Sequence, residues 1–245
     1  INPKDGNILA MVGGTSYKRF KYGLNHVTQI KRQVGSSFKP FVYTVAIDNG
    51  YPPTYKLLNQ PVTLYMPDGS TWTPENTNKS FGGYVSIRDA IRRSVNLIAV
   101  RAIMEPAIAP KRQVIQYAKR MGITSKLLPY ESLALGAADI SPLEMTTAFG
   151  VFANQGVLVE PISILKIEDK NGNVIEENFP SKREALSDQT AFIMTSMMQD
   201  VVDEGTATRI RQFFNLPAAG KTGTTNDYAD AWFIGFTPAF TAGVW

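Results

Sequence analysis

The chain lacks cysteine altogether, and its only histidine is His26. Without cysteine it can form no disulfide, no thiolate nucleophile and none of the common zinc sites. A histidine-based catalytic triad, and most other metal sites, would have to use His26. We therefore expect neither a metal ion nor an organic cofactor.

The chain also lacks long apolar runs and long basic runs. No stretch reaches the roughly 18 consecutive apolar residues that a membrane-spanning helix needs. The net charge is +4, but lysine and arginine are scattered, so nothing indicates a nucleic-acid partner. The 245 residues are 44% hydrophobic and 19% charged, which suffices for a buried core and excludes a disordered chain.

Helix signals fill the middle of the chain, and strand signals stand towards its ends. The expected helices are 36–49, 86–104, 111–121, 141–154 and 187–204. The expected strands are 6–14, a hairpin over 162–177 turning at Asn171-Gly172, 218–224, 230–236 and 239–245. Between them, 51–80 is expected to be a long ordered loop in which 61–65 could form a strand. This order predicts an α+β fold, with an antiparallel sheet flanked by helices plus a mostly helical lobe.

Gly220-Lys221-Thr222 matches the last three positions of a phosphate-binding P-loop. The first glycine of that pattern is replaced by Asn215, and Pro217 removes a backbone N–H that would face the phosphates. The following "DAWFIGF" is typical of a strand, whereas a P-loop needs a helix there. A nucleotide site is therefore the weakest of the functions considered.

The pattern Ser-x-x-Lys occurs twice, at Ser36/Lys39 and at Ser163/Lys166. The second pair lies in an alternating strand, where a separation of three sends the two side chains to opposite faces. The first opens a helix, where residues i and i+3 share a face. Only the first can form a hydroxyl–amine pair, although Ser36 could instead be an N-cap and Lys39 a surface lysine of the first turn.

Two further motifs follow in order along the chain. Ser94-Val95-Asn96 falls inside an expected helix, where it could also be a polar patch between two helices. Lys221-Thr222-Gly223 begins a run of strands, where it could also be an edge strand with a glycine bulge. Ser-x-x-Lys, Ser-x-Asn and Lys-Thr-Gly in this order are the signature of penicillin-interacting serine enzymes.

Here the sequence resembles the transpeptidase domain of class A penicillin-binding proteins, over nearly the whole chain. The segments that carry the resemblance are "GNILAMVGG", "RQVGSSFKPFVYTVAIDNG", "SVNLIAVR", "LALGAADISPLEMTTAFGVFANQG", "DEGTATRI" and "AAGKTGTTNDYADAWFIGFTP". The resemblance departs at Val34, where proline is expected. It implies a fold like that of penicillin-binding proteins and serine β-lactamases.

The resemblance also implies one transpeptidase domain over 1–245, cut from a longer protein. The expected glycosyltransferase domain and membrane anchor would lie upstream, and more sheet and a final helix would follow Trp245. Such a protein works on the outer face of the bacterial cytoplasmic membrane. Its partners would be the donor and acceptor stem peptides of peptidoglycan, and β-lactam antibiotics.

The resemblance also implies functional roles for residues of the three motifs. The implied catalytic residues are Ser36, Lys39, Ser94 and Lys221, and the implied substrate-binding residues are Asn96, Thr222, Gly223 and Thr224. Ser36 would attack the carbonyl between the two D-alanines, with Lys39 as its base. An ordinary lysine pKa of ~10.4 has to fall by ~3 units for that role, which requires ~4 kcal/mol. Burial and a second cation can supply it, and Lys221 would be that cation if the fold brings it close to Lys39.

The fate of the acyl-enzyme separates a transpeptidase from a β-lactamase or a D,D-carboxypeptidase. A class A β-lactamase uses a glutamate to activate the attacking water. The candidate glutamates between the second and third motifs include Glu105, Glu131, Glu144 and Glu160. Glu144 is better explained as part of a capping box, and none of the others fits the role from sequence. A non-catalytic β-lactam sensor is a further alternative.

Overall fold

The computed structural model describes residues 1–14, 22–65, 69–225 and 229–245. Its packed body contains a three-stranded antiparallel sheet in the order β11 (Ala219–Thr224), β12 (Ala231–Phe236) and β13 (Thr241–Val244). Helices α5 (Pro142–Ala153) and α6 (Asp188–Asp203) pack against this sheet and against each other. The three strands occupy the three ranges predicted at the C-terminal end of the chain.

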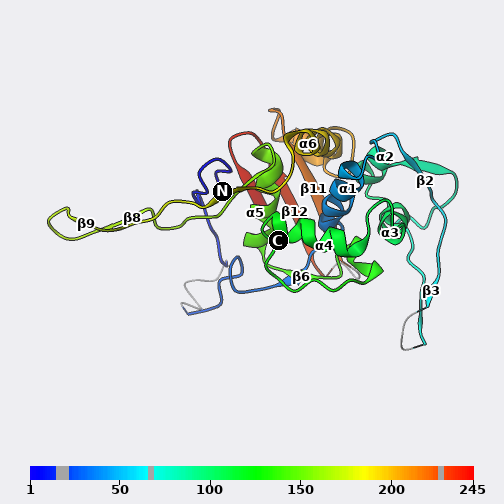
Figure 1. Ribbon diagram of the computed structural model, residues 1–245, viewed down its shortest axis with the longest axis horizontal. Helices are drawn as coiled ribbons and strands as arrows, with labels where there is room; N and C mark the ends of the chain where they lie inside the picture. Colours follow the sequence, from blue (N-terminus) through cyan, green and yellow to red (C-terminus); the bar gives the residue numbers. More distant parts are fainter. Residues whose placement is uncertain (15–21, 66–68, 226–228) are drawn as a thin grey trace.

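Four more helices form a lobe next to α6 (Figure 1). They are α1 (Lys39–Asp48), α2 (Ile87–Arg92), α3 (Asn96–Met104) and α4 (Lys111–Arg120). A 3₁₀ helix, η1 (Gly35–Phe38), leads directly into α1, which contacts α2, α3, α4 and α6. The α+β architecture with a mostly helical lobe is therefore confirmed.

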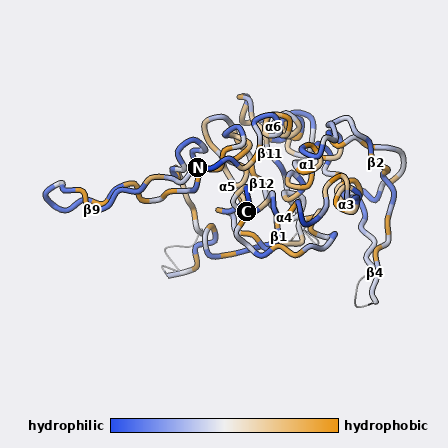
Figure 2. Tube along the Cα trace, in the orientation of Figure 1, coloured by the Kyte–Doolittle hydropathy of each residue, from blue (hydrophilic) through white to orange (hydrophobic). Residues whose placement is uncertain are grey.

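Hydrophobic segments gather in the packed body around these helices, whereas the tip of the long hairpin is hydrophilic (Figure 2). Helix α6 shows how the periodicity produces this packing. Its apolar stripe is wholly buried, as predicted for a core face, and consists of Met194, Met197, Met198, Val201 and Val202. Burying a side chain of this size stabilises the fold by roughly 1.5–3 kcal/mol, so the stripe anchors α6 firmly.

The remaining strands of the described residues pair two by two, all antiparallel. The pairs are β1 (Arg32–Gln33) with β6 (Asp139–Ile140), β2 (Lys56–Leu58) with β5 (Tyr84–Ser86), β3 (Leu64–Tyr65) with β4 (Thr71–Trp72), β7 (Val157–Val159) with β10 (Lys182–Glu184), and β8 (Lys166–Glu168) with β9 (Val174–Glu177). Two further 3₁₀ helices are η2 (Glu131–Leu135) and η3 (Thr208–Gln212). The β8–β9 and β3–β4 hairpins project from opposite sides of the body (Figure 1). The first of them confirms the hairpin predicted over 162–177.

The strand predicted at 6–14 is wrong. Only Asn7 takes part in β-pairing there, through an isolated parallel bridge to Ile162. Leu9 and Val12 are 63% and 75% exposed, so the apolar residues that suggested a strand are not buried against a sheet. Apolar character alone predicted the strand, but a strand forms only where a partner edge is available.

The single helix predicted over 86–104 is also wrong, because it is two helices. Residues Ile87–Arg92 form α2 and residues Asn96–Met104 form α3. Ser94 interrupts them with a φ of +57°, in the left-handed region that a continuing right-handed helix excludes. The helical periodicity continues across the break, which is why the sequence did not reveal it.

In the part of the chain that the structure describes, no helix combines the length and the apolar composition needed to cross a bilayer.

Glu144 is predicted to stabilise the fold as a carboxylate. It completes the capping box that opens α5 and accepts hydrogen bonds from the backbone N–H groups of Thr124, Ser125 and Ser141. Burial by itself would raise the pKa of Glu144, but these hydrogen bonds outweigh it and lower the pKa to about 2. We expect Glu144→Gln to lower the free energy of unfolding at pH 7 by ~1–3 kcal/mol in urea denaturation.

Because the folded-state pKa lies below the ordinary value of 4.5, this contribution is present above pH 4.5 and is lost as the pH falls towards 2. The difference between wild type and variant should therefore shrink over that range. Exposed Glu160 gives a matched control, and Glu160→Gln should change the stability by less than ~0.5 kcal/mol. An equal effect of both substitutions would contradict the role assigned to Glu144.

Candidate active site

Ser36 lies inside η1, three residues before Lys39 begins α1. In a 3₁₀ turn, residues i and i+3 lie one above the other, so both side chains share a face. Neither η1 nor α1 has a side-chain cap, which rules out the N-cap interpretation of Ser36. Within the described residues the half-buried Ser36 hydroxyl makes no hydrogen bond, and it is therefore free for chemistry.

Lys39 is wholly buried, so its interpretation as a surface lysine is wrong. Its Nζ lies 2.7 Å from the Ser94 carbonyl oxygen, 2.7 Å from Asn96 Oδ1 and 3.3 Å from Ser94 Oγ. The first and second motifs, separated by more than fifty residues of sequence, thus meet at this amine.

The second motif occupies the break between α2 and α3, not the interior of a helix. A positive φ at a residue such as Ser94 costs roughly 1–3 kcal/mol and persists only where the surroundings enforce it. The break exposes the Ser94 carbonyl oxygen to Lys39 and places Asn96 at the first position of α3. A continuous helix would have used that carbonyl within its own ladder.

Asn76 enforces the break, and sequence reasoning missed it. Its buried Oδ1 accepts hydrogen bonds from the backbone N–H groups of Asn96 (2.9 Å) and Leu97 (3.1 Å), which caps α3 from outside the helix. Its Nδ2 donates to Asn59 Oδ1 (2.8 Å) and the Ser80 carbonyl oxygen (2.7 Å). Asn76 falls in the segment predicted as a long ordered loop, and no local pattern links it to a helix that starts twenty residues later.

The third motif lies on β11 and brings a second buried lysine to the same hydroxyl. Lys221 Nζ is wholly buried and lies 3.0 Å from Ser94 Oγ, 2.9 Å from the Thr222 carbonyl oxygen and 3.4 Å from Thr222 Oγ1. Ser94 Oγ therefore lies between the two lysine amines. Lys39, Ser94, Asn96, Lys221 and Thr222 form one hydrogen-bonded cluster.

Close backbone packing joins η1 to β11. A Cβ at Gly223 would lie 2.5 Å from the Val34 carbonyl oxygen, and one at Gly35 would lie 2.4 Å from the Thr224 carbonyl oxygen. Strand β11 is at the edge of its sheet, but it pairs with β12 in unbroken register, so the glycine-bulge alternative for the third motif is wrong. The packing places Thr224, which is exposed, beside the residue that precedes Ser36.

Burial controls the charge of both lysines. It lowers the pKa of Lys39 well below its ordinary value, and the positive charge of Lys221 lowers it further. Burial also lowers the pKa of Lys221, to about 7. The two amines lie close together in one buried site, where two positive charges repel each other. Protonation of one amine therefore favours the neutral form of the other.

The other candidates lie outside this cluster. The nucleotide interpretation of Lys221 is wrong. Lys221 lies on strand β11, and the next described element is strand β12, whereas a P-loop needs a helix after the lysine. Lys166, of the second Ser-x-x-Lys match, is on the projecting hairpin and pairs with Glu168. His26 contacts the ring of Trp245. Among the glutamates considered, Glu131 pairs with Lys111, whereas Glu144 caps α5 and Glu105 and Glu160 are exposed.

A cavity of about 310 Å³ opens beside Ser94. It lies between the segment that carries Asn76 and the turn that carries Arg93. Its lining is mostly polar and includes Ser94.

Comparison with known proteins agrees with this arrangement. A family model for the penicillin binding protein transpeptidase domain matches residues 1–245. A penicillin-binding protein 1A of Aquifex aeolicus is 38% identical over 246 residues, and the match covers the whole chain and 33% of that relative. A penicillin-binding protein 1A of Neisseria lactamica is 36% identical over 253 residues, covering the whole chain and 31% of the relative.

The crystal structure of penicillin-binding protein 1A from Haemophilus influenzae has the same fold. It matches with a TM-score of 0.90 at 31% identity, over 99% of this chain and 42% of that one. The chain thus spans only 31–33% of the length of these curated relatives. The motifs, the fold and the family model agree, and the chain belongs to the penicillin-binding protein transpeptidase domain family.

Proposed function

We propose that this chain is a serine D,D-transpeptidase domain that crosslinks peptidoglycan stem peptides through an acyl-enzyme on Ser36. The observation that carries the proposal is the convergence of two wholly buried lysines, Lys39 and Lys221, on Ser94 Oγ. An amine buried in this way beside a second cation can be neutral near pH 7, and a neutral lysine can act as a base. Lys39 shares a helix face with Ser36, so Lys39 is the base.

The number of acceptors does not separate the two amines, because each has three oxygen atoms within 3.4 Å. The position of Lys39 on the same face as Ser36 and the effect of charge do separate them. The positive charge of Lys221 lowers the pKa of Lys39 beyond the effect of burial. We therefore assign Lys39 as the base and Lys221 as the cation that keeps Lys39 neutral.

The reaction then proceeds by acyl transfer. Ser36 Oγ gives its proton to Lys39 Nζ and bonds to the carbonyl carbon between the two D-alanines of a donor stem. The C–N bond to the terminal D-alanine breaks, and Ser94 passes a proton to the departing amine. An amine of a second stem attacks the ester, loses its proton to the lysine–serine pair and releases Ser36. A β-lactam follows the first half of this path and remains attached.

We assign the substrate contacts from the roles that the three motifs imply. The donor carries a terminal carboxylate, which Thr222 and Thr224 bind with the charge of Lys221 beside them. Asn96 hydrogen-bonds the donor amide, and Gly223 allows the strand to approach η1 closely. The backbone N–H groups of Ser36 and Thr224 form the oxyanion hole, since η1 and the end of β11 pack together.

We assign the approach of the acceptor stem to the side of Ser94, where a cavity of about 310 Å³ opens. Since the substrate is peptidoglycan, we assign the reaction to the extracytoplasmic face of the bacterial cytoplasmic membrane. A β-lactamase or carboxypeptidase would transfer the acyl group to water, whereas in a sensor the acyl group would remain on Ser36.

Acylation of Ser36 is tested directly by intact mass after incubation with benzylpenicillin. We expect a mass increase equal to one drug molecule in wild type, stable over hours, and complete loss of the adduct in Ser36→Ala. The matched control is Ser37→Ala, because Ser37 is buried and donates to the Val34 carbonyl oxygen at 2.6 Å. That variant should still be acylated.

An adduct of equal size in Ser36→Ala would refute the assignment of Ser36 as the nucleophile. Rapid loss of the adduct from wild type, with release of hydrolysed drug, would indicate a β-lactamase instead. Crosslinked product from donor and acceptor peptides separates a transpeptidase from a sensor.

The charge relation between the lysines is tested by the pH dependence of acylation in Lys221→Gln. Removing a neighbouring cation stabilises the ammonium form of Lys39 and raises its pKa. The acidic limb of the acylation rate should therefore move to higher pH, and each unit of movement lowers the rate on that limb about tenfold. Stopped-flow acylation with a chromogenic cephalosporin measures it.

Lys166→Gln is the control, because it removes an exposed lysine from the other Ser-x-x-Lys match. Its profile should coincide with that of wild type. A limb that stays in place in Lys221→Gln, or moves to lower pH, would contradict the role of Lys221 as the cation that keeps Lys39 neutral.

A further inference from the structure

Thr206 makes the shortest side-chain contact to the third motif from outside it. It follows α6 in an exposed turn, and its Oγ1 lies 2.6 Å from Thr222 Oγ1. Thr222 Oγ1 also lies 3.4 Å from Lys221 Nζ. Sequence reasoning assigned no role to Thr206.

The hydroxyl of Thr222 has one hydrogen and two acceptor sites. Lys221 can only donate to it. Either threonine hydroxyl can donate across the 2.6 Å contact. When Thr206 is the donor, protein donors occupy both acceptor sites of Thr222. The single Thr222 hydrogen is then free to point at a ligand, and the ligand group that fits beside a lysine must accept hydrogen bonds and carry negative charge.

The backbone of Thr206 is held against the end of α2. Its N–H donates to the Arg92 carbonyl oxygen at 3.3 Å. A Cβ at Gly205 would lie 2.4 Å from the same oxygen, so the turn can approach α2 this closely only with glycine at that position. The backbone of Arg92, at the end of α2, therefore fixes the position of Thr206.

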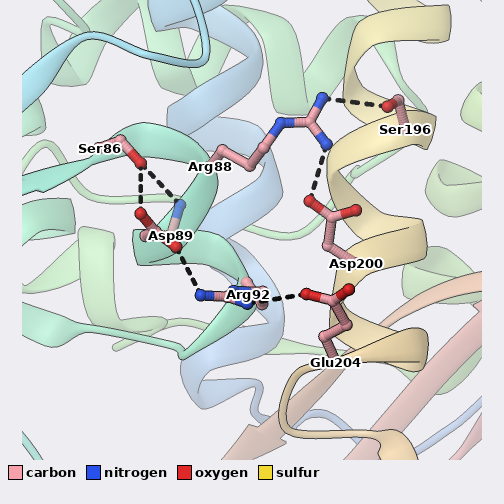
Figure 3. A network of polar contacts seen from close by, with 7 residues as sticks. All are labelled: Ser86, Arg88, Asp89, Arg92, Ser196, Asp200 and Glu204. Carbon is pink, nitrogen blue, oxygen red and sulfur yellow. Dashed lines mark hydrogen bonds and ion pairs between the residues drawn. The ribbon is translucent and has the colours of Figure 1, made fainter.

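Two arginines of α2 hold this end of α6 in place (Figure 3). Arg92 bridges Asp89 (2.7 Å) and Glu204 (2.9 Å), and Arg88 binds Asp200 at 2.7 Å. Each such pair stabilises a surface only modestly, but the network fixes the register of one helix against the other. Ser94 comes two residues after the end of α2, so the same helix end positions both the second motif and Thr206.

We propose that Thr206 is a positioning residue that turns the Thr222 hydroxyl towards the carboxylate of the donor stem or of a β-lactam. This inference rests on the proposed function, in which the third motif binds that carboxylate. Thr206 acts only through Thr222 and touches no reacting atom. Its effect therefore falls on recognition of the carboxylate and not on the chemical step.

The test compares benzylpenicillin with its methyl ester, which lacks the anionic carboxylate, on Thr206→Val and Thr206→Ser. Valine matches threonine in shape without a hydroxyl, and serine restores the hydroxyl. We expect Thr206→Val to raise the concentration of benzylpenicillin needed for half-maximal acylation roughly tenfold, with little change in the limiting rate. The value for the ester should stay nearly unchanged, and Thr206→Ser should restore wild-type behaviour.

Thr208→Val, two residues further along in η3, is the control for a threonine-to-valine change in the same segment. Melting temperatures show whether each variant is folded. Equal weakening of drug and ester in Thr206→Val, or no change in either, would overturn the inference while leaving the acyl-enzyme intact. Absence of acylation in folded wild type would instead refute the proposed function, and the inference with it.

Discussion

Two lysine amines buried around a single serine hydroxyl are the constraint on which the rest of this structure depends. Removing an ammonium group from water is costly unless it gains hydrogen bonds or loses its proton. Lys39 and Lys221 each gain three oxygen neighbours, and burial lowers the pKa of both. The site is therefore stable only if α1 and β11, which carry the two lysines, meet the turn between α2 and α3. That turn, the start of α3 and Thr222 of β11 supply the oxygens.

The turn between α2 and α3 is the least expected of these elements and the most strongly supported. Ser94 holds a left-handed backbone that a helix would not tolerate, and Asn76 compensates by capping the new helix from another segment. On the other side, the arginines of α2 bind α6 (Figure 3). The strained residue is held at both ends, which explains how a costly conformation persists at a functional position.

Local signals predicted the local structure well. The capping box of Ser141 and Glu144 and the turn at Asn171-Gly172 appeared where the sequence placed them, because each depends on residues only a few positions apart. The strand at 6–14 and the unbroken helix at 86–104 were wrong for the opposite reason. A strand needs the edge of a partner strand, and the helix break needs Asn76. Both lie outside the short stretch of sequence from which the hydrophobic periodicity is read.

By itself the sequence determined the chemical groups of the site and their order along the chain. The Ser-x-x-Lys pair at Ser36 and Lys39 could be chosen over its duplicate because three-residue spacing has opposite consequences in helix and strand. Only the tertiary structure decided that Lys39 meets Ser94 across 55 residues and that Lys221 meets it across 127. Burial, and with it the lowered pKa of each lysine, follows from those long-range contacts, because the removal of water is a property of the packed site and not of any residue in it.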